Sequence, residues 1–331
     1  MTVQRTPPLN PEGLVRRIPQ KPHELLSRTT AQSDLFVLAH IGIPRLDISE
    51  WQLNVIGAVD NPLRFTFQDL CRLEKRRVEC FHQCAGFPRR PDLPTRRIAN
   101  VEWAGAAVRD VLCHAGVKSD ARFLWAYGLD EGIYEDNRPE QYAKDLPLDR
   151  LDAGEWLLAY EINGEPLDPE HGYPVRLVVP GFYGTNSVKW VCQLEVARER
   201  YPGKFTQVLY NDPVPGTNVS RPVWEAGPEC VIVSPADQAT LAPGKVQIWG
   251  WTWGYRPIAE VHISYDGGGS WTKVVPENRC GWSWQRFENW WTAVDFGDYS
   301  LIARAIDIEG KMQPLQDARN AAHNIAVSIR C

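Results

Sequence analysis

The sequence lacks any long apolar run, and this absence limits what the protein can be. None of its 331 residues falls in a stretch of about 18 consecutive apolar residues, so a membrane-spanning helix is not expected. The N-terminal segment contains Arg16 and Arg17 but continues with Ile-Pro-Gln-Lys-Pro instead of an apolar core, so it does not match an export signal. We therefore expect a cytoplasmic protein with no membrane contact, or a periplasmic one if a leader has been removed.

Paired cysteine motifs are also missing. The eight cysteines are spread along the chain without a C-x2-C pair, which argues against a small disulfide-bonded scaffold and fits reduced thiols in the cytosol. No C-x-x-C-H motif occurs either, so a covalently attached c-type haem is not expected on this chain. Any electrons that the protein handles must then pass to an external partner.

The chain has no excess of positive charge. Its 36 basic and 41 acidic side chains give a net charge of −5, which predicts no general attraction to nucleic acid or to anionic membranes. Apolar residues make up 44% and charged residues 23%, as in ordinary folded proteins, and the length suits two domains. Any anion that the protein binds must be held by local positive charge.

The residue pattern predicts four segments. Residues 1–33 are rich in Pro and Arg without periodicity and are expected to form an extended arm. Residues 34–212 mix short strand-like runs with helix-like segments, such as a predicted helix over 104–116 that ends at Gly116, so we expect a mixed α+β domain. Residues 213–228 have the composition of a linker, and 229–331 show the short alternating runs of an all-β immunoglobulin-like sandwich.

The stretch over residues 78–92, VECFHQCAGFPRRPD, suggests a metal site. Cys80, His82 and Cys84 occupy alternate positions, which on a strand would place all three on one face, as in a zinc site. Residues four apart on a strand are roughly 13 Å apart, however, whereas thiolates on one zinc ion lie within about 4 Å of each other. Turn residues follow only after Cys84, so we expect Cys84 to be the single thiolate ligand, with Cys80 as a packing residue.

A second stretch, HGYPVRLVVPGFYGTNSVKW over residues 171–190, combines basic side chains with glycines. Gly181 and Gly184 would let the backbone approach a bound anion, and charged donors hold phosphate well. The expected donors are His171, Arg176, Ser187 and Lys189. Beside a thiolate ligand, this stretch predicts an anion-binding cofactor site.

Together these stretches resemble the sulfite oxidase family of molybdenum enzymes. The resemblance is carried by CAGFPRR, VEWAGAAVRDVL, YGLD and LLAYEINGEPLDPEHGYPVRLVVPGFYGTNSVKW, within residues 36–210. The stretch from VIVSPADQ to ARAIDIEGKMQP is similar to the dimerisation domain of that family. The resemblance implies a molybdopterin-binding catalytic domain followed by a dimerisation domain, in a homodimeric oxidoreductase.

The resemblance also implies roles for single residues. Cys84 matches the thiolate that ligates molybdenum. Positions around the molybdopterin and its phosphate match His40, Asp130, His171, Arg176, Ser187 and Lys189. Two aromatic residues of the substrate pocket match Trp103 and Tyr210, and an anion-binding arginine matches Arg89 or Arg90. The implied substrate is sulfite or a related small oxyanion, and the implied electron acceptor is an external one, a cytochrome or dioxygen.

The chain departs from the family pattern at two places. Leu38 stands where the family commonly has an arginine, and Phe87-Pro88 stand where it usually has a single asparagine. A hydrogen bond to a charged group is worth about 1.5–3 kcal/mol, so the loss of an arginine predicts weak sulfite oxidation or a different substrate.

Two other functions remain open from the sequence. The same metal site could run in reverse, as a reductase of an oxyanion or S-oxide, or the chain could keep the scaffold without catalysis.

Overall fold

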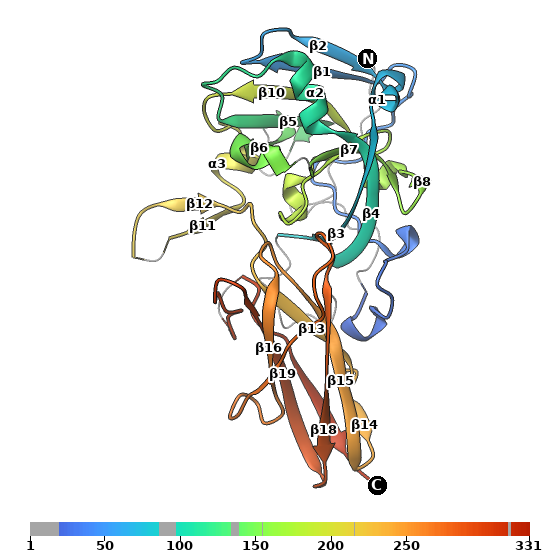
Figure 1. Ribbon diagram of the computed structural model, residues 1–331, viewed down its shortest axis with the longest axis vertical. Helices are drawn as coiled ribbons and strands as arrows, with labels where there is room; N and C mark the ends of the chain where they lie inside the picture. The colour runs from blue at the N-terminus through green and yellow to red at the C-terminus, as the bar shows by residue number, and fades with distance from the viewer. Residues whose placement is uncertain (1–19, 86–96, 134–138, 154, 215, 317–318) are drawn as a thin grey trace. The chain divides into compact units, whose positions relative to one another are not determined.

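The protein folds mainly as β-strands with few and short helices (Figure 1). The structure is a computed structural model that describes residues 20–85, 97–133, 139–153, 155–214, 216–316 and 319–331. By its internal contacts the chain divides into two compact units. The first contains Phe36–Val78 and Glu102–Trp224, and the second contains the described part of Ile18–Leu35, Glu79–Val101 and Glu225–Cys331.

The domain limits expected from the sequence stay a prediction. The contacts within the structure divide the chain differently at Glu79–Val101 and at the end of the predicted arm. The division at Trp224 and Glu225 falls inside the predicted linker, but Glu79–Val101 is assigned to the second unit although it was expected in the catalytic domain. The end of the predicted arm is assigned there too. From residue 20 the arm forms 3-10 turns at η1 (Pro22–Glu24) and η2 (Gln32–Asp34), and Leu25 is buried with its carbonyl accepting from Trp251 Nε1 at 2.7 Å.

A mixed five-stranded sheet of order β2-β1-β10-β5-β6 forms the larger part of the first unit. Its strands are β1 (Gln52–Gly57), β2 (Leu63–Thr66), β5 (Phe123–Ile133), β6 (Pro139–Pro147) and β10 (Val191–Ala197). Only β1 and β10 pair in parallel, and β5 and β6 form a long antiparallel pair. Along β5 the residues alternate between buried and half-buried, which is the period expected of a strand with one face in the core.

A second sheet has the order β3-β4-β7-β8, with β9 also paired to β7. Its strands are β3 (Lys75–Gln83), β4 (Ile98–Ala107), β7 (Leu157–Ile162), β8 (Glu165–Pro166) and β9 (Arg176–Val178). The first unit also holds the short hairpin of β11 (Asn211–Pro213) and β12 (Ser220–Pro222), drawn in yellow in Figure 1.

The helices of the first unit are short. They are α1 (Phe67–Arg72), α2 (Val108–Ala115) and α3 (Lys204–Gln207), with 3-10 turns at η4 (Leu148–Ala153), η5 (Pro169–His171) and η6 (Gly184–Asn186). Helix α1 begins with a capping box: the Thr66 side chain accepts from Asp69 N, and the Asp69 carboxylate accepts from Thr66 N in return. An α+β domain was expected for residues 34–212, and the structure shows many strands and a few short helices there.

The helix predicted over 104–116 is wrong in its first part. Residues 104–107 belong to β4, and only Val108–Ala115 are helical, with Gly116 as the expected left-handed C-cap at φ 71°. The physical reason is close pairing with β7: a Cβ on Gly105 would lie 2.0 Å from the Leu158 carbonyl oxygen. Small residues that suit a helix here let two strands approach instead, so tertiary packing outweighs local propensity.

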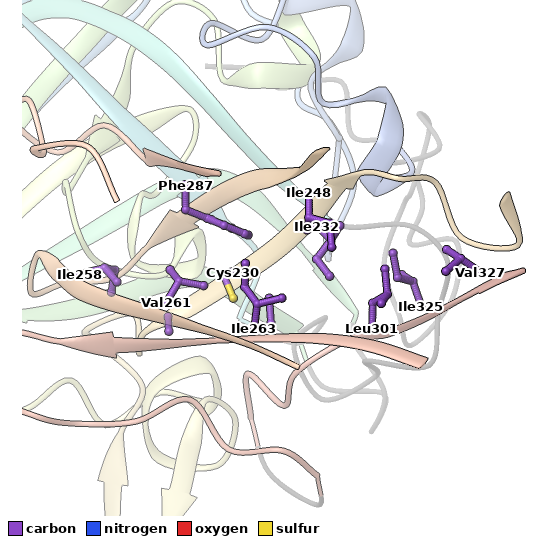
Figure 2. Packing of buried hydrophobic residues seen from close by; sticks show 12 residues of the cluster. Cys230, Ile232, Ile248, Ile258, Val261, Ile263, Phe287, Leu301, Ile325 and Val327 are labelled. Atoms are coloured by element: carbon purple, nitrogen blue, oxygen red, sulfur yellow. The ribbon is translucent and has the colours of Figure 1, made fainter. Parts of the chain in front are cut away.

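The second unit is built from two sheets that share one apolar core (Figure 2). One sheet has the order β13-β15-β18, with β13 (Glu229–Ser234), β15 (Gly244–Trp253) and β18 (Gln285–Ala293). The other has the order β14-β20-β19-β16-β17, with β14 (Ala239–Leu241), β16 (Ile258–Ser264), β17 (Thr272–Val274), β19 (Gly297–Asp307) and β20 (Asn324–Ile329). The side chains of the core come from both sheets and include Cys230, Ile232, Ile248, Val261, Phe287, Leu301 and Val327. Their burial stabilises the unit, since each large apolar side chain removed from water contributes about 1.5–3 kcal/mol.

The described residues contain no helix long and apolar enough to cross a membrane.

Gly250 lies where the backbone of β15 comes close to the backbone of β13 and to the Phe287 ring. A Cβ at this position would lie 1.9 Å from the Val231 carbonyl oxygen and 2.9 Å from Phe287 Cζ. Gly250→Ala should therefore destabilise the protein by about 1–3 kcal/mol, because strand pairing or the Phe287 ring must shift. Urea unfolding measures the effect, with Gly297→Ala as the control, since a Cβ there would have only an ordinary contact at 3.8 Å. Equal stability of the two variants would contradict this account.

Candidate cofactor and substrate site

Four residues predicted to bind an anion lie together in the first unit. The Arg176 guanidinium, on β9, donates from Nη1 to the His171 carbonyl at 3.0 Å and from Nη2 to the Ser187 carbonyl at 3.1 Å. The Ser187 hydroxyl accepts from Val179 N at 3.1 Å, and Lys189 Nζ donates to the Glu170 carbonyl at 2.9 Å. The predicted basic stretch is therefore one cluster, held by backbone acceptors.

Local chemistry explains why η5 presents His171 to this cluster. Asp168 caps the turn, because its carboxylate accepts from His171 N at 2.8 Å, and Pro169 follows at the first position. Gly172 ends the turn with φ 110°, and a Cβ there would lie 3.0 Å from Arg176 Cβ and 3.2 Å from Lys189 Cβ. Glycine at this position lets the basic residues pack closely.

Asp130 faces the same cluster from β5. Its side chain is buried, and burial raises the pKa of its carboxyl group, although the positive charge of Lys189 opposes this shift. Burial lowers the pKa of Lys189, the neighbouring Arg176 charge lowers it further, and Asp130 opposes both. A Cβ on Gly128 would lie 2.2 Å from Asp130 Oδ1, so this glycine makes room for the carboxyl group.

The environment of His171 favours the neutral imidazole. Burial lowers its pKa, and the neighbouring Asp168, whose Oδ1 lies 2.8 Å from His171 Nδ1, opposes the shift. His171 Nε2 and Asp130 Oδ1 are both buried and have no hydrogen-bond partner among the described residues. Such atoms are costly to leave unpaired, so they indicate a place where a polar ligand completes the structure.

Trp103 lies within this cluster, on β4. It is completely buried, and the Arg176 guanidinium carbon lies 4.7 Å from the centroid of its ring. The stacked ring helps to fix the direction of the Arg176 fork.

His40 and Tyr210 form a second cluster in the first unit. The Tyr210 hydroxyl lies 2.5 Å from His40 Nε2, so the two groups share a short hydrogen bond. The His40 ring stacks on Tyr142 at 5.4 Å and meets Phe205 edge-on at 5.4 Å. Tyr210 has a left-handed backbone at φ 57°, which is unfavourable for a large side chain and is typical of a functional position.

Cys84 lies in the second unit, directly after β3. It is buried, and its backbone N–H donates to the Arg97 carbonyl at 3.0 Å. The residue before it, Gln83, donates to Glu229 at 2.5 Å and accepts from Trp253 Nε1 at 3.0 Å. The residue after it, Ala85, accepts from Arg319 through its carbonyl. The backbone that carries the thiol is thus held on both sides.

A zinc site on Cys80, His82 and Cys84 finds no support. Cys80 and His82 lie in β3, as the alternating pattern predicted, and Cys80 is buried. No group of three or more His, Cys, Asp or Glu side chains suited to a metal occurs within the described part of the chain. The remaining predicted site residues, Arg89 and Arg90, lie outside the described residues.

Sequence reasoning gave no role to several residues of these clusters. They are Asp168, Tyr142, Phe205, Gln83 and Glu229. One signal could have found part of this set: Asp168 directly before Pro169 is the pattern of an N-cap followed by the first residue of a turn.

The buried basic cluster with its unpaired polar atoms suits a bound anionic cofactor, and comparison with known proteins identifies the class of protein as an oxidoreductase. The family profile that matches residues 40–205 describes an oxidoreductase molybdopterin-binding domain. The chain is 30% identical to the mitochondrial sulfite oxidase of Rattus norvegicus over 89% of this chain and 59% of the relative. It is 30% identical to sulfite oxidase of Arabidopsis thaliana over 88% of this chain and 84% of the relative.

Among solved structures, the chain is similar to the sulfane dehydrogenase SoxCD of Paracoccus pantotrophus. The TM-score is 0.82 at 26% identity, and the match covers 99% of this chain and 91% of the other. The protein belongs to the sulfite oxidase family of molybdopterin-dependent oxidoreductases. It spans about three fifths of the length of the mammalian relatives that it matches, as the 59% coverage shows.

The first cluster fits the cofactor that the family implies, a molybdenum ion carried by molybdopterin. Molybdopterin carries N–H and carbonyl groups on its pterin ring and a phosphate on its side chain. These groups suit the unpaired Asp130 Oδ1 and His171 Nε2 together with the basic side chains of Arg176 and Lys189. The buried polar atoms of this chain are therefore of the kind that the cofactor needs.

Asp130→Asn is expected to change how stability depends on pH. Because the folded-state pKa of Asp130 is raised, its contribution to stability is present at acid pH and is lost as pH rises through the raised value. The asparagine variant lacks this loss, so its melting temperature relative to the parent protein should increase between pH 5 and pH 8. Differential scanning fluorimetry measures the difference, with the exposed Asp149→Asn as control. A difference that stays constant with pH would rule out the buried carboxyl as its source.

Proposed function

We propose that the protein is a molybdenum-dependent oxidoreductase that adds an oxygen atom to sulfite or a related small oxyanion. The observation that carries the proposal is the cluster of His171, Arg176, Ser187 and Lys189, with buried polar atoms that lack partners. The names of the relatives support it, since they are sulfite oxidases and a sulfane dehydrogenase.

In the proposed reaction, sulfite and water give sulfate, two protons and two electrons. The electrons pass to an external one-electron carrier such as a cytochrome, or to dioxygen. The chemistry supplied by the bound cofactor is two-electron oxygen-atom transfer, and Cys84 would be its protein ligand, since a thiolate is a soft and strongly donating ligand.

The chain's own residues would hold the substrate and move protons. The Tyr210 hydroxyl, which shares a hydrogen bond with His40 Nε2, would donate to a substrate oxygen when the imidazole is turned to other partners. His40 and Tyr210 are both partly exposed, so solvent and a small anion can reach them. The family resemblance implies that Arg89 or Arg90 also takes part in binding the anion.

Other features of the protein are part of the same proposal. The two-sheet unit would be an immunoglobulin-like domain through which two copies form a homodimer, and the whole fold would then be of α+β type with an all-β second domain. A cytoplasmic location is also part of the proposal, and the net charge of −5 fits a protein without nucleic-acid or membrane partners.

Cys84 is expected to be the molybdenum ligand. Cys84→Ser should keep molybdopterin bound but lose at least about a hundredfold in sulfite-dependent ferricyanide reduction, because a neutral hydroxyl replaces a donating thiolate. Molybdenum and pterin analysis beside the assay measures both effects. Cys80→Ser is the matched control, since Cys80 is also buried but lies within β3. A loss of activity in Cys80→Ser but not in Cys84→Ser would reject the assignment. Purified protein without stoichiometric molybdenum would favour a non-catalytic scaffold.

Leu38 is expected to limit the affinity for sulfite. Leu38→Arg should lower the Michaelis constant for sulfite about tenfold to a hundredfold, since it returns a charged donor to a partly exposed position two residues from His40. Leu38→Gln is the uncharged control and should change it little. A low micromolar constant in the parent protein would show that Leu38 does not weaken sulfite binding. Faster reduction of nitrate, chlorate or sulfoxides with viologen than oxidation of sulfite would favour the reverse reaction.

A further inference from the structure

Lys144 is a buried cation that the proposed mechanism does not use. It lies on β6 two residues after Tyr142, so both side chains are on the same face of the strand. The residue is only 1% exposed, which is rare for lysine and costly unless it has a specific role.

The contacts of Lys144 connect β6 to the Tyr210 cluster. Its Nζ donates to the Phe205 carbonyl of α3 at 2.7 Å and lies 5.1 Å from the centroid of the Tyr210 ring. Phe205 and Tyr210 are two of the aromatic residues that surround His40. The ammonium group is thus placed against the residues proposed to bind the oxyanion.

The charged groups near Lys144 do not neutralise it directly. The neighbouring Asp145 is buried, but its carboxylate accepts from Arg200 Nε at 2.7 Å and from Arg200 Nη2 at 3.3 Å. The charged residue of α3 itself is another cation, Lys204. Within the described residues no carboxylate forms a hydrogen bond to Lys144, so its charge is available to a bound anion.

We propose that Lys144 is a positioning residue that contributes positive charge to oxyanion binding at Tyr210 and His40, where Leu38 carries none. The inference rests on the proposed function and extends it to one residue. Lys144 acts through the Phe205 carbonyl and the Tyr210 ring, since it is too deeply buried to contact a solvent-accessible anion. At an effective dielectric constant of about 20, a charge about 6–12 Å away changes affinity by roughly one to two orders of magnitude.

The protonation of Lys144 gives this role a measurable signature. Burial lowers the pKa of Lys144 to about 7, an effect that the Asp145 charge opposes and the Arg200 charge strengthens. A bound oxyanion favours the charged form, so binding takes up a proton whenever the lysine is neutral beforehand. Affinity for an anion of constant charge should therefore fall as pH rises above about 7, by up to about tenfold for each pH unit.

Sulfate is a suitable probe because it remains a dianion between pH 6 and pH 9. Titration calorimetry of the cofactor-loaded, full-length protein should show sulfate binding that weakens with pH above 7. Lys144→Met should bind sulfate about tenfold to a hundredfold more weakly at pH 6 and without this pH dependence. Lys144→Arg should bind tightly at all pH values, since arginine stays charged. Lys204→Met, which removes the neighbouring cation of α3, is the matched control and should behave as the parent protein.

Two results would overturn the inference: unchanged pH dependence in Lys144→Met, or equal loss of binding in the methionine and arginine variants, which would indicate a purely structural role. Circular dichroism and thermal melting show whether each variant is folded. The Michaelis constant for sulfite in the same variants tests the proposed function separately. Sulfate binding that depends on Lys144, in a protein that does not oxidise sulfite, would support the inference and reject the proposed function. Sulfite oxidation by a protein whose sulfate binding does not depend on Lys144 would support the proposed function and reject the inference.

Discussion

The two backbone hydrogen bonds of Arg176 are the interaction on which the cofactor site depends. Through its Nη atoms the guanidinium joins the His171 carbonyl of η5 to the Ser187 carbonyl after η6, and its carbon atom lies over the Trp103 ring, 4.7 Å from the centroid. A planar fork with fixed donors can hold two turns in one orientation, which a lysine could not do. With these turns in place, Lys189 and Asp130 lie close together in the protein interior. Burial raises the pKa of Asp130 and lowers the pKa of Lys189.

Burial of polar groups is common to both clusters of the first unit. His171 Nε2 and Asp130 Oδ1 are unpaired among the described residues, and Lys144 is buried beside Tyr210. Each arrangement costs folding free energy unless a ligand or a charge compensates it. This is the pattern expected of a protein that trades some stability for a pre-organised anion and cofactor site.

The limits of sequence reasoning are clearest at particular residues. The Gly116 C-cap and the two-sheet character of residues 229–331 follow from local signals and were predicted. The strand at 104–107 was not predicted, because its alanines and glycine favour a helix locally and only the close approach of β7 makes them a strand. Lys144 was also missed, since one lysine in a polar stretch has no motif and becomes notable only when it is buried.

The sequence by itself determined the family, the cofactor class and the set of polar residues that converge around Arg176. These properties depend on residue types at short and fixed spacings, which the chain carries whatever its fold. Only the tertiary structure decided that Trp103 lies beneath Arg176, that His40 pairs with Tyr210, and that Lys144 faces the Tyr210 ring. These contacts join residues between 66 and 170 positions apart, so packing between segments far apart in the sequence, and not local preference, brings them together.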